Sequence, residues 1–295
     1  MKNQKDKYAD VLPRSAVVAG QFYPAEASEL KKQLDSFFEN AKPASMNRPI
    51  SIIAPHAGYM FSGQIAADAF NQVRGQDYDV IVILGANHSW IRSDRISIYP
   101  RGGYETPLGL AEIDEEIVEA LFDASEPCTF IPEFHFDEHS IEVQIPFVQH
   151  LFPAIKIVPI LIGYPKVDLL KAFGEILADT LKHRKPLLVA SSDLSHYPTY
   201  SDALYMDQQT LDAILTLDPF HLHSIIRLQM QCKIPNLRTC ACGEGAILAT
   251  IAAAKKLGAN QATVINYANS GDSVYGDHVQ VVGYGALALT CEKQA

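Results

Sequence analysis

The chain has 295 residues, of which 48% are hydrophobic and 20% charged, and its formal net charge is -10. This composition is typical of a globular protein and excludes an intrinsically disordered one. An acidic chain with no basic cluster longer than residues 182–185 lacks the surface that phosphate binding needs, so we expect no nucleic-acid partner. We also expect no membrane span, because no apolar run is long enough to cross a bilayer.

The N-terminal segment and the cysteines indicate the domain organisation and the cellular compartment of the protein. Residues 1–10 are charged and lack the apolar core of a signal peptide. We expect a flexible tail over residues 1–12 and one α/β domain over residues 13–295. Five cysteines are an odd number for a disulfide framework, so a reducing cytoplasm is the expected location.

Helical and strand periodicities alternate along the chain, starting with a helix that has apolar residues at helical spacing. Helices are predicted over residues 25–41, 63–73, 113–124, 140–152, 168–182, 201–217 and 244–258, with Pro146 indicating a kink or a late start in the fourth. Strands are predicted over residues 49–54, 78–85, 156–163, 186–193, 262–269 and 278–290, the last two as an antiparallel hairpin. This alternation predicts a single α/β domain with a central, mostly parallel or mixed sheet flanked by helices.

Polar side chains follow the predicted strands at the point where each one ends. In an open α/β sheet the carboxyl ends of parallel strands share one edge, where ligands bind. We therefore expect the strand ends to bring one set of side chains together, namely His56, Asn87, His88, Asp193, His196, Ser270 and Asp272. Either of the first two histidines alone is best explained as a hydrogen-bonded structural residue, but as a pair His56 and His88 are predicted metal ligands.

The third metal ligand and the supporting residues stay open at this point. Cys242 precedes a glycine-rich helix start, which favours a thiolate, although a lone cysteine is more often a small buried hydrophobe. His139 and Glu142 are three residues apart and are predicted to line or support the pocket together with Asn87, or else to begin a helix. Asp193 is predicted to orient His196 as a catalytic acid or base.

An ordered set of short motifs resembles the Memo family, known in prokaryotes as AmmeMemoRadiSam system protein B. The motifs include "APHAGYMFSG", "ILGANHSW", "EHSIEVQIPF", "VASSDLSHY", "CGEGAI" and "NSGDSVYGDHVQVVGYGA". The resemblance implies a fold similar to class III extradiol dioxygenases, which are non-haem iron enzymes. It also implies a pocket formed by His56, His88, Asp193, His196 and Cys242, with the cysteine in place of the carboxylate ligand of those dioxygenases.

Three functions are compatible with such a pocket. The first is an oxidoreductase that uses iron or copper, with a small molecule bound at an open metal position. The second is a binding or adaptor protein that keeps the pocket for a small molecule or a peptide without turnover. The third is a zinc-dependent hydrolase.

Overall fold

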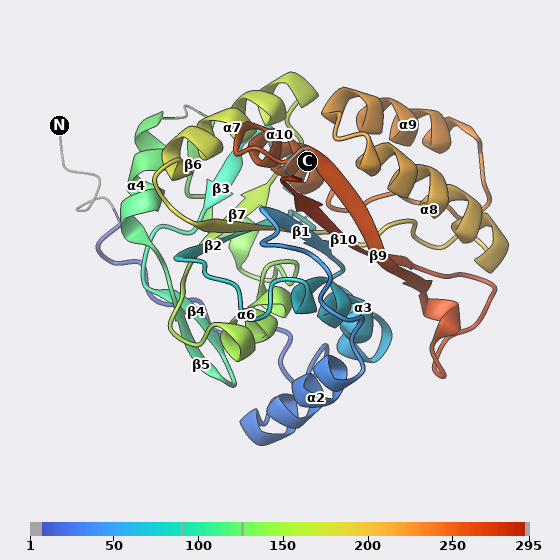
Figure 1. Cartoon of the computed structure of the whole chain (residues 1–295), viewed down its shortest axis with the longest axis horizontal. Coiled ribbons are helices and arrows are strands. Elements are labelled where there is room, and N and C mark those ends of the chain that lie inside the picture. Colours follow the sequence, from blue (N-terminus) through green and yellow to red (C-terminus); the bar gives the residue numbers. More distant parts are fainter. Residues whose placement is uncertain (1–7, 90, 125–126, 293–295) are drawn as a thin grey trace.

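The computed structural model describes residues 8–89, 91–124 and 127–292, which fold around one mixed β-sheet (Figure 1). In sheet order the strands are β6 (Cys128–Thr129), β3 (Ile96–Ile98), β7 (Lys156–Ile162), β2 (Val80–Ala86), β8 (Pro186–Ser191), β1 (Ser51–Ala54), β10 (Gly283–Thr290) and β9 (Gln261–Asn269). The four central strands β7, β2, β8 and β1 are parallel to one another. At the two sides β3 runs antiparallel to β7, and β10 runs antiparallel to both β1 and β9.

Helices cover both faces of this sheet, which explains why its central strands are nearly continuous apolar runs. On one face α7 (Val167–Leu181) and α10 (Glu244–Lys256) pack against each other, with α4 (Glu115–Ala124) beside α7 (Figure 1). On the other face α3 (Tyr59–Asn71) packs on β1, β10 and β9, with α2 (Ala27–Glu39) against it. Every residue of β1, β2 and β8 is buried. The predicted single α/β domain with a mixed sheet is confirmed.

Several local predictions are confirmed, and one long helix was missed. The last two predicted strands pair antiparallel as β9 and β10. A 3-10 turn, η1 (Glu142–Gln144), precedes α6 (Ile145–Leu151), so Pro146 marks a late helix start. Helix α9 (Pro219–Gln231) follows α8 (Tyr200–Leu215) and was not predicted, although Asp218 caps it by accepting hydrogen bonds from two backbone N–H groups.

The remaining elements are short and lie at the periphery. Strands β4 (Gly103–Thr106) and β5 (Gly109–Glu112) form a separate hairpin around the "ETPLG" turn. A single turn of helix, α5 (Pro132–His135), follows β6, and the 3-10 turn η2 (Ser270–Asp272) follows β9.

The predicted tail lies only partly within the described residues, because residues 1–7 fall outside them. Of the rest, the Tyr8 ring packs against Phe122 and Phe130 at centroid distances of 5.4 and 5.8 Å. The Leu12 carbonyl accepts a hydrogen bond from the hydroxyl of Tyr99 at 2.8 Å. Residues 8–12 therefore contact the domain. Across the described ranges, no helix combines the length and the apolar character that crossing a membrane requires.

Candidate metal centre

Three neighbouring parallel strands each deliver a polar side chain to the same edge of the sheet. His56, His88 and Asp193 each lie two residues beyond the last residue of β1, β2 and β8, respectively. These strands are adjacent in the order β2-β8-β1, so the three side chains converge, as the strand-end argument predicts. The Asp193 Oδ1 atom accepts a hydrogen bond from the backbone N–H of His56 at 2.7 Å, which ties two of the strand ends together.

The imidazole of His56 is held in one tautomer by Ser191. The Ser191 hydroxyl donates its only proton to the Ser140 carbonyl at 2.5 Å and accepts a hydrogen bond from Gln144 Nε2 at 2.8 Å. It can therefore only accept from His56 Nδ1, which lies 2.9 Å away. The other ring nitrogen, Nε2, consequently faces the Cys242 Sγ atom and is hydrogen-bonded to it at 3.0 Å.

Glu138 fixes His88 in the same way. Its carboxylate accepts hydrogen bonds from His88 Nδ1 at 2.9 Å and from the His88 backbone N–H at 2.6 Å. Burial by itself lowers the pKa of His88, but Cys242 and Glu138 outweigh it and raise that pKa to about 11. Burial likewise raises the pKa of Glu138, yet His88 brings it down to about 2. A carboxylate behind a histidine that leaves Nε2 free is the usual support of a metal-binding imidazole.

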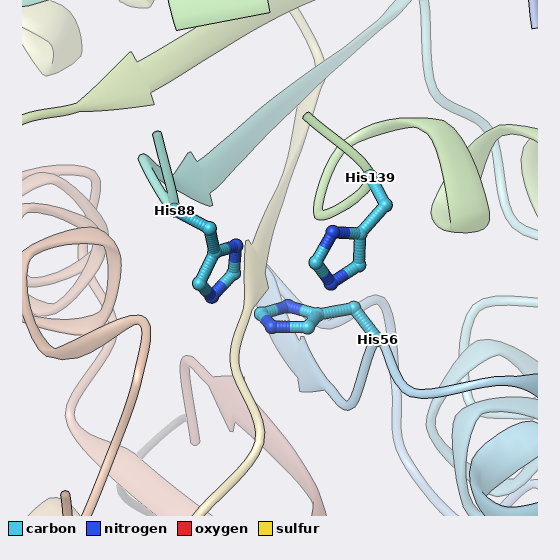
Figure 2. A group of neighbouring side chains, drawn as sticks. All are labelled: His56, His88 and His139. Atoms are coloured by element: carbon cyan, nitrogen blue, oxygen red, sulfur yellow. The ribbon is translucent and has the colours of Figure 1, made fainter. Parts of the chain in front are cut away.

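His139 completes a group of three imidazoles that face one another (Figure 2). Its ring stacks on His88 at a centroid distance of 4.7 Å and meets the ring of His56 edge-on at 5.4 Å. Burial, reinforced by the charge of His56, lowers the pKa of His139 to about 3, so its imidazole is neutral at neutral pH. The sequence placed His139 only as a supporting residue, whereas the structure makes it a candidate ligand.

Glu142 has the second of its two predicted roles, because it begins a helical turn and its contacts lie elsewhere than in the pocket. The helical turn begins at Glu142, so His139 precedes it and the two side chains do not share a helix face. The fully buried Glu142 carboxylate instead accepts hydrogen bonds from Arg14 Nη1 and the Tyr23 hydroxyl, both at 2.6 Å, and from two backbone N–H groups. It anchors the N-terminal segment to the domain.

Cys242 lies directly against the histidines, immediately before α10. Its Sγ atom also accepts a hydrogen bond from the backbone N–H of Asp193 at 3.3 Å. Burial raises the pKa of the Cys242 thiol, but His56, His196 and His88 together bring it well below its ordinary value. Cys242 with His56 and Asp193 forms a second candidate ligand group. Cys240, by contrast, is a fully buried side chain next to the Met230 sulfur.

Asp193 and His196 are close but not hydrogen-bonded. The Asp193 Oδ2 atom lies 3.8 Å from His196 Nε2, which is too long for the orienting bond that the sequence predicted. The other carboxylate oxygen is engaged by the backbone of His56. Within the described residues, His196 Nε2 is buried and has no hydrogen-bond partner. This nitrogen is thus available to a ligand of the pocket.

The other strand-end residues have local roles. The Asn87 side chain bridges Ser89 N–H and the Ile91 carbonyl at 3.1 and 3.0 Å, which shapes the loop that carries His88. Trp90 of the same motif lies outside the described residues. Asp272 closes a capping box at η2 after β9, and it accepts a hydrogen bond from the Tyr200 hydroxyl. Neither Ser270 nor Asp272 joins the histidine cluster, because β9 lies at the edge of the sheet and not beside β1.

Comparison with known proteins shows the family of this chain. A family described as "Memo-like protein" matches residues 14–288. The chain belongs to the Memo family. It is 37% identical to a MEMO1 family protein of Desulfurococcus amylolyticus, covering 93% of this chain and 98% of that protein. A MEMO1 family protein of Nitrosopumilus maritimus is 34% identical, with coverage of 93% and 98%. An uncharacterized protein of Escherichia coli K12 shares the fold, with a TM-score of 0.50 and 15% identity over 81% of this chain and 99% of that one.

The residues of this Memo-family site fit a transition-metal ion. The donor atoms within each of the two ligand groups lie within 4.8 Å of one another, and both groups include His56. The Nδ1 atoms of His56 and His88 are engaged by Ser191 and Glu138, so the Nε2 atoms of both rings are directed to the cluster. Imidazole and thiolate donors suit iron, copper or zinc, whereas magnesium and calcium prefer oxygen ligands.

Proposed function

We propose that this Memo-family protein is a metal-dependent oxidoreductase, with iron or copper held by His56, His88 and Cys242. One observation carries the proposal: the Nε2 atom of His56 contacts the Cys242 sulfur at 3.0 Å, and the ring of His88 lies 5.2 Å from that of His56. A thiolate among imidazoles favours a redox-active metal or zinc. His139 would be an alternative third ligand, because it belongs to the three-histidine group.

The chain itself would contribute positioning and proton transfer. When bound, a redox metal supplies electron transfer between a substrate and dioxygen. His196 would hold or release a proton at Nε2, the buried nitrogen without a partner among the described residues. The nearby Cys242 and Asp193 oppose the effect of burial and raise the pKa of His196, which favours the proton-loaded imidazole. Asp193 would fix the backbone at His56 through its 2.7 Å hydrogen bond.

Elemental analysis tests the proposal directly. The wild type, a His56→Ala/His88→Ala variant and a His183→Ala/His221→Ala control are purified without oxygen or chelators. The control removes two exposed histidines away from the cluster. We expect stoichiometric iron or copper in the wild type and in the control, and its loss in the first variant without loss of the folded state by circular dichroism.

Dioxygen uptake then separates the three functions. Metal-dependent uptake with a panel of catechols and thiols supports the oxidoreductase. If the bound metal is zinc, if His56→Ala/His88→Ala loses it, and if the activity needs no dioxygen, the protein is a hydrolase. Absence of any metal after anaerobic reconstitution would refute the metal centre and favour a binding protein that retains the pocket.

A further inference from the structure

A cavity of about 850 Å³ opens over the donor cluster. His88, His196 and Cys242 line it, together with residues of the segments 163–168 and 238–246 and of the first turns of α9. The exposed rings of Tyr164 and Phe220 also line it, at 56% and 43% exposure. The cavity therefore combines the reactive side chains with aromatic surface that a ligand's carbon skeleton would cover.

The charges that line the cavity are opposite in sign to the chain as a whole. The protein has a formal charge of -10, yet the cavity is lined by four cationic groups, Lys166, Arg227, Arg238 and His88, against three anionic ones, Asp168, Glu244 and Cys242. The cavity thus carries an excess of positive charge in an acidic protein. Such a local potential attracts anions.

Two of these charges already pair with each other. Glu244 accepts a hydrogen bond from Arg227 Nη2 at 2.8 Å and pairs with His223 Nδ1 at 2.6 Å. The side chains of Lys166 and Arg238 are exposed and form no hydrogen bond or ion pair with any described residue. Arg238 is the one of these two unpaired cations that lies on the segment leading to Cys242.

Backbone hydrogen bonds tie Arg238 to the reactive cluster. Its N–H donates to the His196 carbonyl at 3.0 Å, and the His196 N–H donates to the carbonyl of Thr239 at 3.0 Å. This pairing fixes the segment that carries the guanidinium beside the segment that carries the unpartnered His196 imidazole. An anion held by Arg238 would place the rest of its molecule next to His196 and Cys242.

We propose that the cavity binds a small carboxylic acid whose carboxylate pairs with Arg238. This assignment rests on the proposed function, in which the bound acid would react at the donor cluster. A guanidinium presents two parallel N–H groups that match the two oxygens of a carboxylate. The rings of Tyr164 and Phe220 suit an apolar or aromatic remainder of such a molecule.

Isothermal titration of the full chain tests the assignment. The probes are benzoate, 3-phenylpropionate and hexanoate, with benzamide as the uncharged counterpart of benzoate and inorganic phosphate as a second anion. Arg238→Gln is compared with Arg74→Gln, a matched change at an exposed arginine that does not line the cavity. We expect at least one acid to bind the wild type and the control, and to bind Arg238→Gln about 10- to 100-fold more weakly. Benzamide affinity should not change.

The outcomes separate this inference from the proposed function. Unchanged acid binding in Arg238→Gln, or no acid binding the wild type more tightly than about 10 mM, overturns the carboxylate site. Phosphate that binds more tightly than every acid, through Arg238, overturns the choice of carboxylate. Acid binding that survives in His56→Ala/His88→Ala and still depends on Arg238 supports the site even where the metal centre fails. Arg238→Gln itself should keep the metal content of the wild type, since it is not a ligand.

Discussion

Replacing Glu138 with Gln tests how the chain orients its metal-binding imidazoles. The carboxylate accepts hydrogen bonds from His88 Nδ1 and Ser140 N–H on Oε1, and from the His88 backbone N–H on Oε2. A glutamine has one oxygen, so its amide N–H₂ must face a donor on one side. The loss of a hydrogen bond to a buried charge should cost about 1.5–3 kcal/mol of unfolding free energy. Because His88 loses its fixed orientation, metal affinity should fall about 10- to 100-fold.

Zinc competition against a chromophoric chelator measures this affinity without redox chemistry, and urea unfolding of the metal-free protein measures the stability. Asp137→Asn is the matched control, because it removes the same charge from the adjacent, exposed position. We expect the control to match the wild type in both assays. If Glu138→Gln binds zinc as tightly as the control does, Glu138 does not position His88 for a metal, and the assignment of His88 as a ligand loses its main structural support.

Two further predictions concern buried charges away from the ligands. Arg14→Met leaves the fully buried Glu142 carboxylate without its ion-pair partner and should lower the unfolding free energy by about 3–5 kcal/mol. Urea unfolding should show that Arg14→Met/Glu142→Gln recovers part of this lost free energy. An unfolding free energy of Arg14→Met equal to that of the wild type would contradict the role of this pair. Burial raises the pKa of Asp207 from 3.8 to about 6, against the hydrogen bonds from Tyr267 and Ser195. The folded state thus holds this proton more tightly than the unfolded chain, so the contribution of Asp207 to the unfolding free energy is fully present below about pH 4 and is lost, by up to about 3 kcal/mol, as pH rises through 6. Asp207→Asn should remove this loss in unfolding curves recorded between those pH values, and an identical pH profile in the two proteins would refute the assignment.

The sequence by itself determined the fold class and the position of the site. Near-continuous apolar runs that alternate with helical periodicity predict a covered parallel sheet, because both faces of such strands must be buried. The polar residues that end those runs then have to meet at one sheet edge. This reasoning brought together His56, His88 and Asp193 correctly. It failed for Ser270 and Asp272, because strand order is not readable from the pattern and β9 lies at the edge of the sheet.

Only the tertiary structure decided which groups complete the cluster. Cys242 is a small side chain in a loop, and its role follows from a contact with His56 across 186 residues of sequence. Glu138, His139 and Glu142 are close in sequence, yet their contacts differ. Glu138 contacts His88, His139 joins the imidazole cluster, and Glu142 pairs with Arg14 near the N-terminus. Their directions depend on where a 3-10 turn begins, and packing against distant segments sets that point more strongly than local propensity does. Periodicity therefore specifies which strand ends meet, while the contacts between distant segments specify which donor atoms face one another.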